Sequence, residues 1–310
     1  MLRNNPKEYW SLLNKSKGET DKAQNAPEIS IDNASWTNYF QNLNSLSEID
    51  KCEINKLNDI LADLEKENLS TVLDYKVTNQ EIFKAINKLK NGKASGLDLM
   101  LNEMLNAGQK TLIGCLNKLF NLIFTHSTYP KQWINSCVGK LFNIVLNTRL
   151  VDHFTKRDIL TDCQVGFRSK SRTTDHMCIL KCLVDKYTNS KGNKLYACFV
   201  DFKRAFDTVI HPGMRIKMLK SDIGGNFYHL IKHMYTLNKL RVKVDNKLGQ
   251  CFNSHIGVMQ WDVLSPSLFN LFIHDLPNCL QNCSESVSLC TGRIDCLLYA
   301  DDVIIFFNSE

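Results

Sequence analysis

The sequence predicts an α+β fold in which a helix-rich first part precedes a small antiparallel sheet. Three observations predict this class: helical segments with an apolar face before residue 190, an apolar segment that ends in an acid, and a second apolar segment interrupted by two acids. The chain has 310 residues, with 44% hydrophobic and 23% charged content, as is ordinary for a globular protein. This length is sufficient to bury one large core or two smaller ones.

Residues 1–70 are polar and rich in Asn and Lys, and we expect a lead-in followed by a partly helical linker. The helix-rich part is expected to begin at about residue 71. Its first helix is predicted over 77–89, because Thr78 and Glu81 match a capping box and apolar residues follow at helical spacing.

Two longer helices are expected next. Segments 110–126 and 136–154 both repeat apolar residues at the spacing of a helix with one buried face. In the second segment, Lys140 and Arg149 fall outside the apolar face, so they are expected to point to solvent.

Two later apolar segments carry acids at positions that suit metal chemistry. Residues 196–200 are expected to form a buried strand that ends at Asp201, and 297–307 to form a β-hairpin with Asp301 and Asp302 at its tight turn. The acid pair alone would also fit a plain turn, because Asp is common in turns. Two strands that each present a carboxylate, however, suit a site for two divalent cations, and carboxylate oxygens suit Mg²⁺.

The residues around these acids resemble a known family. Phe199-Val-Asp-Phe-Lys-Arg-Ala-Phe-Asp-Thr-Val209 and Tyr299-Ala-Asp-Asp302 are similar to the two catalytic motifs of reverse transcriptases, in the form used by non-LTR (LINE-type) retrotransposons. The resemblance implies that Asp201, Asp301 and Asp302 are catalytic and bind two Mg²⁺ or Mn²⁺ ions.

The resemblance also implies residues that contact the incoming nucleotide. Phe206 matches the steric gate that excludes the ribose 2′-hydroxyl. Gln260 lies in Gly257-Val-Met-Gln-Trp-Asp-Val-Leu-Ser-Pro266, which resembles a loop close to template and nucleotide. Relatives have Gly after that Gln, and the indole of Trp261 is expected to obstruct the site. Stacking of Trp261 on a base is the alternative.

Two basic loops resemble segments that contact the template. Gly92-Lys-Ala-Ser-Gly-Leu-Asp98 contributes Lys93, and the segment that starts with Gln164-Val-Gly-Phe-Arg168 contributes Arg168, Lys170 and Arg172. Basic side chains near hydroxyl groups and Gly suit contacts to backbone phosphates, although solvated loops are the alternative. The formal net charge of +6 fits a polyanionic partner and is too small to establish one.

The sequence departs from the family after Tyr129-Pro-Lys-Gln-Trp133. Relatives have two fingers strands there, with basic groups that hold the triphosphate, whereas this chain continues directly into the next helix. The chain also stops eight residues after Asp302. A thumb is therefore expected to be absent.

The implied fold is the right-hand core of a polymerase, with helix-rich partial fingers at about 71–195 and an antiparallel palm at about 196–310. The implied activity is that of an RNA-directed DNA polymerase. With an RNA template, a DNA primer and dNTP, it would transfer nucleotides to the primer 3′-hydroxyl, and the departures above are expected to impair this copy. The alternative is a retroelement remnant without catalysis that at most binds nucleic acid weakly. The sequence predicts no oligomeric state.

The twelve cysteines do not show the Cys-x₂-Cys spacing of a zinc finger or ribbon. The amino terminus is polar, and no apolar segment has the length of a membrane span. We therefore expect free thiols in a soluble, intracellular protein that makes no membrane contact. A small zinc site is the alternative, with four candidate ligands: Cys279, Cys283, Cys290 and Cys296.

Overall fold

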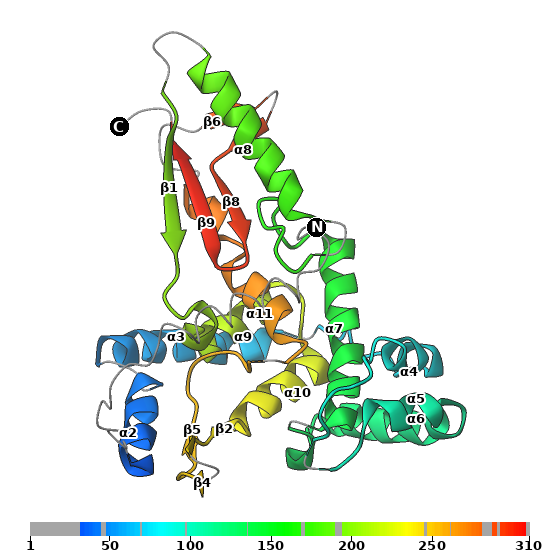
Figure 1. The fold of residues 1–310 in the computed structure, drawn as a ribbon. Helices are drawn as coiled ribbons and strands as arrows, with labels where there is room; N and C mark the ends of the chain where they lie inside the picture. The colour runs from blue at the N-terminus through cyan, green and yellow to red at the C-terminus, as the bar shows by residue number, and fades with distance from the viewer. Residues whose placement is uncertain are drawn as a thin grey trace, which may run out of the picture. The chain divides into compact units, whose positions relative to one another are not determined.

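The computed structural model of the chain describes residues 32–44, 48–68, 70–96, 98–134, 136–168, 171–189, 194–244, 247–260, 262–280, 287–289 and 292–307. The chain divides into two compact units. The larger unit contains the described residues of 41–240 and 251–310, and the smaller unit contains 32–40 and 241–250. Figure 1 shows the elements of both units.

The smaller unit combines the start of a helix with a short hairpin. The helix is α2 (Asn33–Leu43), and the hairpin pairs β3 (Lys243–Val244) with β4 (Lys247–Leu248) in antiparallel fashion. The side-chain amide of Asn33 donates a hydrogen bond to the carbonyl of Lys247 at 3.3 Å.

Helices make up most of the larger unit, and its largest apolar cluster includes the buried rings of Phe120, Phe142 and Phe227. The helices in chain order are α3 (Glu48–Glu67), α4 (Asn79–Ile86), α5 (Asn102–Ala107), α6 (Gln109–His126), α7 (Cys137–Arg157), α8 (Thr173–Thr188), α9 (His211–Lys220), α10 (Gly225–Thr236), α11 (Ser265–Ile273) and α12 (Leu276–Leu280), with 3₁₀ turns η2 (Lys131–Trp133) and η3 (Ala205–Thr208). No helix in the described part of the chain combines the length and the apolar character needed to cross a bilayer.

α3 lies in the segment that is predicted to be a partly helical linker, and it packs on α9. Leu61 of α3 is 4% exposed and belongs to the largest apolar cluster. A carboxylate oxygen of Glu65, also on α3, lies 2.8 Å from the Lys232 ammonium of α10. Both apolar and charged contacts therefore hold α3 in the larger unit.

The first predicted helix is confirmed as α4, which is shorter than the predicted range. Thr78 is its N-cap: the hydroxyl accepts a hydrogen bond from the amide of Glu81 at 3.2 Å, and the Glu81 carboxylate accepts one from the amide of Thr78 at 2.8 Å. This is the predicted capping box. The helices predicted over 110–126 and 136–154 are confirmed as α6 and α7.

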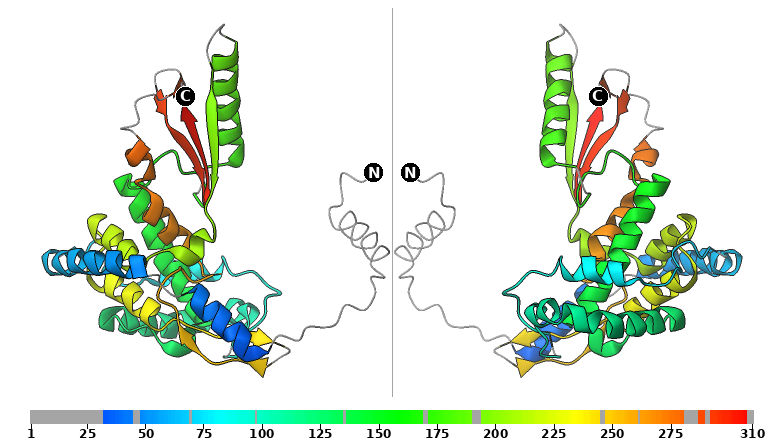
Figure 2. Two further views of the ribbon diagram at one scale, coloured as in Figure 1. Left: turned by 90° about the vertical axis from the view of Figure 1, so that its left-hand side faces the viewer. Right: turned by 90° about the vertical axis from the view of Figure 1, so that its right-hand side faces the viewer.

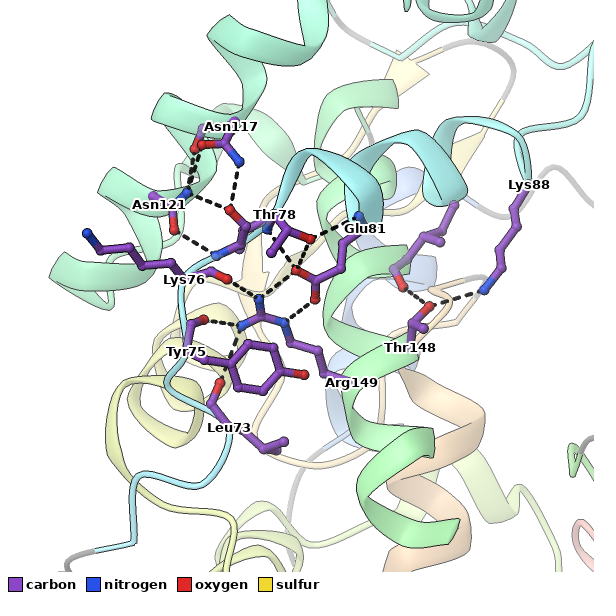
Figure 3. Close-up of polar contacts among 12 residues, drawn as sticks. Leu73, Tyr75, Lys76, Thr78, Glu81, Lys88, Asn117, Asn121, Thr148 and Arg149 are labelled. Atoms are coloured by element: carbon purple, nitrogen blue, oxygen red, sulfur yellow. Dashed lines mark hydrogen bonds and ion pairs between the residues drawn. The ribbon is translucent and has the colours of Figure 1, made fainter. Parts of the chain in front are cut away.

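Arg149 corrects one expectation, since its side chain is 1% exposed and does not point to solvent. Nε donates to Glu81 Oε1 at 2.6 Å and Nη2 donates to Glu81 Oε2 at 3.0 Å (Figure 3). α7 is buried around most of its circumference, so this position has no solvent side. A buried guanidinium needs such partners. Its remaining donors reach the backbone carbonyls of Leu73, Tyr75 and Lys76.

Three strands form the antiparallel sheet of the larger unit, in the order β1-β9-β8. They are β1 (Tyr196–Asp201), β8 (Cys296–Tyr299) and β9 (Asp302–Phe307). The register places Asp201 opposite Asp302 and Tyr196 opposite Phe307. Two smaller antiparallel pairs join β2 (Lys239–Leu240) to β5 (Phe252–Asn253), and β6 (Val287–Leu289) to β7 (Gly292–Ile294).

Helices cover both faces of this sheet. On one face, Leu183 of α8 is buried in a cluster with Leu297 and Phe306, and α8 runs alongside the strands in Figure 2. On the other face, Leu298 belongs to a cluster against which Ile273 of α11 and residues of α12 pack. Adjacent residues of β8 thus point to opposite faces, as alternation in a strand requires.

The strand predicted at 196–200 is confirmed as β1, but the prediction that this strand is buried is wrong. Phe199 is 71% exposed, and Ala197, Cys198 and Asp201 are exposed as well. β1 is an edge strand, whose partner in the described structure is β9 alone, and the clusters on the sheet faces are built mainly from β8 and β9. An apolar run of five residues does not distinguish an edge strand from a central one.

Candidate active site

The hairpin of β8 and β9 is confirmed, with a correction at its turn. Tyr299 pairs with Asp302, so the loop consists of Ala300 and Asp301, and Asp302 is the first residue of β9. Ala300 has a φ of 56°, a conformation that tight hairpin loops require and that a residue with a Cβ rarely adopts. The three acids therefore occupy three settings: a strand end, a loop and a strand start.

The backbone register brings two of these acids face to face. Asp201 and Asp302 are partners in the β1–β9 ladder, where opposite Cα atoms are about 4.5–5.5 Å apart. Asp301 precedes Asp302 in the chain. Arg204, three residues after Asp201 in the chain, pairs with Asp207, its Nε lying 3.4 Å from Asp207 Oδ2. Two like charges directly across a ladder repel each other, so a bound cation would relieve this pair.

The side chains of Asp201, Asp301 and Asp302 are not gathered into a three-ligand cluster in the described structure. Within the described ranges, no three His, Cys, Asp or Glu side chains lie close enough together to enclose a metal ion. Asp201 and Asp302 are exposed, and Asp301 is partly exposed. Oxygen donors of this kind fit Mg²⁺ or Mn²⁺ in phosphoryl transfer, where one or two carboxylates bind the ion and water and substrate phosphates complete its coordination.

The alternative zinc site depends on residues that the structure describes only in part. Cys279 is exposed and Cys296 is buried. Cys283 and Cys290 lie outside the described residues.

Phe206, the predicted steric gate, is fixed between two aromatic rings. Its ring stacks on Phe269 of α11, with centroids 4.5 Å apart and planes 18° apart. Phe167 meets it edge-on, with centroids 6.2 Å apart. A ring held on two sides has little freedom to move away from an incoming ligand.

The loop that contains Gln260 is joined to the segment after β1. The side-chain amide of Gln260 donates to Asp207 Oδ1 at 2.7 Å, and the amide of Val258 donates to the carbonyl of Phe206 at 2.8 Å. Gly257 has a φ of 86°, and a Cβ there would lie 2.8 Å from the carbonyl oxygen of Asp207. The close approach of these two segments therefore requires Gly at 257. Trp261 lies outside the described residues.

The predicted template-binding residues have different environments. Arg168 donates to the carbonyls of Thr161 at 2.7 Å and Gln164 at 3.1 Å, so its guanidinium supports its own loop. Arg172 is exposed at the start of α8, and Lys170 lies outside the described residues.

Lys93 is exposed in the loop between α4 and α5, and it lines a cavity of about 220 Å³. Gln260 lines the same cavity, together with Lys140 and with Asp262, a carboxylate that was not predicted from the sequence as a site residue. Asp262 Oδ1 accepts a hydrogen bond from Asn143 at 2.8 Å, and burial raises the pKa of its carboxyl group. Asp262 lies three residues before the start of α11 at Ser265. An acid at the start of an apolar segment was the feature of the sequence that could have indicated this site residue.

The comparison with protein families defines the class. Residues 127–310, more than half of the chain, match the model of reverse transcriptases (RNA-dependent DNA polymerases), and the chain belongs to this family. The predicted relation to non-LTR retrotransposons is confirmed by similarity to their RNA-directed DNA polymerases.

The chain is 29% identical over 263 residues to the probable RNA-directed DNA polymerase from transposon BS of Drosophila melanogaster, an alignment that covers 74% of this chain and 28% of that protein. It is 27% identical over 260 residues to the RNA-directed DNA polymerase from mobile element jockey of Drosophila funebris, covering 75% and 28%. It is 25% identical over 260 residues to the retrovirus-related Pol polyprotein from type-1 retrotransposable element R2 of Nasonia vitripennis, covering 76% and 24%. The chain thus spans about a quarter of the length of these relatives.

Proposed function

We propose that this chain provides the catalytic core of an RNA-directed DNA polymerase of a LINE-type retroelement. On an RNA template, it would join a dNTP to the 3′-hydroxyl of a DNA primer and release pyrophosphate. The observation that carries the proposal is the register of β1 with β9, which sets Asp201 opposite Asp302 beside the loop residue Asp301. Partial fingers would extend over about 71–195, and a palm over about 196–310.

Asp201, Asp301 and Asp302 would hold two Mg²⁺ or Mn²⁺ ions. Such ions, when bound, activate the attacking hydroxyl and neutralise charge on the phosphates. The backbone hydrogen bonds between β1 and β9 keep the acids of the two strands at a fixed spacing. Catalysis by positioning depends on such rigidity, because reacting groups must be held close to their productive geometry.

Phe206 would exclude a ribose 2′-hydroxyl from the nucleotide site. Its support by Phe269 and Phe167 favours this role, because a gate that could swing aside would not discriminate. Gln260 would lie next to the nucleotide, held by its hydrogen bond to Asp207.

Lys93, Arg168, Lys170 and Arg172 would contact the template, with different contributions. Lys93 and Arg172 are exposed and can reach phosphates directly. The internal bonds of Arg168 favour a role in holding the loop shape for its neighbours.

A second candidate is a retroelement remnant that lacks turnover. The direct connection from η2 to α7 favours it, because α7 begins at Cys137, four positions after Trp133. That connection leaves no room for the two strands whose basic groups hold the triphosphate in relatives. Fewer cations around a triphosphate mean weaker stabilisation of the transition state.

Primer extension on an RNA template, with Mg²⁺ or Mn²⁺, distinguishes the two candidates. The assay compares the chain with the double variant Asp301→Ala/Asp302→Ala. The control is Asp63→Asn, at an α3 carboxylate that is 74% exposed and pairs with Lys66. Extension that is lost in the double variant and retained in the control supports the polymerase. No extension by the folded chain supports the remnant.

A further inference from the structure

The side chain of Gln164 is buried against the catalytic hairpin, although its segment was expected to contact template. Gln164 is 1% exposed. Its Oε1 accepts hydrogen bonds from the amide of Ala300 at 3.0 Å and from the amide of Gly166 at 2.8 Å. Its Nε2 donates to the carbonyl of Ala300 at 3.2 Å. One side-chain amide thus satisfies both backbone groups of the residue that precedes Asp301.

The segment around Gln164 is itself fixed along the outer edge of β8. The amide of Leu298 donates to the carbonyl of Cys163 at 2.8 Å, and the amide of Val165 donates to the carbonyl of Leu298 at 3.0 Å. Gln164 and Leu298 form an isolated parallel bridge. We call the two hydrogen bonds between the Gln164 side chain and the Ala300 backbone the clamp. The clamp is therefore anchored to the same sheet that carries the proposed catalytic acids.

A second buried amide supports this arrangement from α11. Asn270 is 1% exposed, and its Nδ2 donates to the carbonyl of Gly166 at 2.8 Å. A Cβ at Gly166 would lie 2.2 Å from the amide nitrogen of Ala300, so only Gly allows the two segments to approach this closely. Phe269, next to Asn270 in the chain, stacks on Phe206. The clamp thus connects the acid-bearing loop to the helix that supports the gate.

The loop needs such support because Ala300 adopts a conformation that L-residues disfavour. Ala300 has a φ of 56°, and a non-glycine residue in this region is strained and persists only when its surroundings hold it there. An apolar side chain at 164 would leave the amide and the carbonyl of Ala300 unsatisfied in a buried place.

We propose that Gln164 is a positioning residue, which fixes the Ala300–Asp301 loop so that the Asp301 carboxylate faces the site shared with Asp201 and Asp302. This inference rests on the proposed function for its catalytic consequence, whereas the clamp itself is a property of the fold. A displacement of about 1 Å at a reacting group can lower a rate about 100-fold. Loss of a residue that orients a metal ligand lowers metal affinity or activity by about 10–100-fold.

The test compares Gln164→Met, which keeps the length of the side chain and removes both hydrogen-bonding groups, with Gln109→Met. Gln109 is a matched control, because its amide also bonds another residue, Asn87, at 3.1 Å, and it lies on α6. Gly166→Ala is a second variant, which keeps the Gln164 amide group but adds a Cβ 2.2 Å from the amide nitrogen of Ala300 and 3.0 Å from Gln164 Oε1. Melting temperature and circular dichroism identify the variants that fold.

Three readouts are measured on the folded variants. Hydrogen exchange at the Ala300 amide is expected to accelerate about tenfold or more in Gln164→Met, as loss of a hydrogen bond worth about 1.4 kcal/mol implies. Mn²⁺ affinity is expected to fall about 10–100-fold. In single-nucleotide addition, kcat is expected to fall by a similar factor while KM for dNTP changes little, because the clamp acts on Asp301 and leaves the nucleotide contacts intact. Gln109→Met is expected to match the wild-type chain in all three.

If the folded Gln164→Met variant shows the wild-type rate of hydrogen exchange at the Ala300 amide, Gln164 does not hold Ala300 in place and the proposal is wrong. Faster exchange with unchanged Mn²⁺ affinity would overturn the positioning role and leave a structural one. Absence of primer extension by the wild-type chain would count against the proposed function alone, because exchange and Mn²⁺ binding are measured without catalysis.

Discussion

Replacement of Arg149 by Met is expected to lower the free energy of unfolding by about 3–5 kcal/mol, because it breaks a buried ion pair and leaves one partner without its counter-charge. The guanidinium makes two contacts to Glu81, at 2.6 and 3.0 Å, and lies over the Tyr75 ring at 3.9 Å from its centroid (Figure 3). Met fills a similar volume and makes none of these polar contacts.

The size of the loss in free energy of unfolding depends on the groups that lose Arg149 as a partner. Glu81 has a side chain that is 22% exposed, so water can solvate part of its charge and the loss stays below that of a fully buried carboxylate. Three backbone carbonyls, of Leu73, Tyr75 and Lys76, also lose a donor. For a chain of this length, a loss of 3–5 kcal/mol corresponds to a decrease in Tm of about 5–8 °C.

The effect depends on pH with a defined sign. Burial alone would raise the pKa of Glu81, but the hydrogen bonds and the charge of Arg149, together with hydrogen bonds from Thr78, hold that pKa below its ordinary value of 4.5. The stability from this pair is therefore fully present above pH 4.5 and is lost as pH falls through the lowered pKa. The difference between the wild-type chain and Arg149→Met should shrink over that acidic range.

Urea denaturation at pH 7 measures the prediction. The matched control is Arg157→Met on the same helix, where the guanidinium is 51% exposed and its partner Asp222 is 57% exposed. An exposed pair contributes at most about 1 kcal/mol, so the control should unfold close to wild type. If Arg149→Met and Arg157→Met lose the same free energy of unfolding, the reasoning is refuted, because burial would then have no influence on how much an ion pair stabilises the fold.

Two further predictions concern the site. Phe206→Val should raise incorporation of ribonucleotides relative to deoxyribonucleotides at least about tenfold in primer extension, because the space next to the ribose opens; unchanged selectivity would remove Phe206 from the gate. Gly257→Ala should lower the free energy of unfolding by about 1–2 kcal/mol or more, since the new Cβ meets the carbonyl of Asp207 at 2.8 Å with φ at 86°. A melt identical to wild type would show that this loop can move away from η3.

Local signals in the sequence predicted the local structure well. Thr78 and Glu81 lie three residues apart, and their capping box depends on that spacing alone. The hairpin of β8 and β9 was predicted from two apolar segments around two acids, but the pattern did not decide which residues form the loop. Asp302 lies in the strand because Tyr299 pairs with it, a register that composition does not encode.

Long-range contacts explain what the sequence did not predict. Arg149 was placed in solvent because it falls outside the apolar face of α7, and its partner Glu81 is 68 residues away. The segment that starts at Gln164 was expected to contact template because of its basic residues, whereas the side chain of Gln164 bonds Ala300, 136 residues away. A buried polar side chain takes its role from partners that only the fold brings near.

The most direct measurement is single-turnover addition of one dNTP to a primer on an RNA template, with the wild-type chain, Asp201→Asn and Asp63→Asn. Asp201→Asn removes one charge from the β1 side of the site and keeps the shape of the side chain. If Asp201 and Asp302 form one catalytic site across the β1–β9 ladder, the wild-type chain and Asp63→Asn add the nucleotide, and Asp201→Asn is slower by about 100-fold or more. Equal rates in all three, or no addition by the folded wild-type chain, would contradict this account.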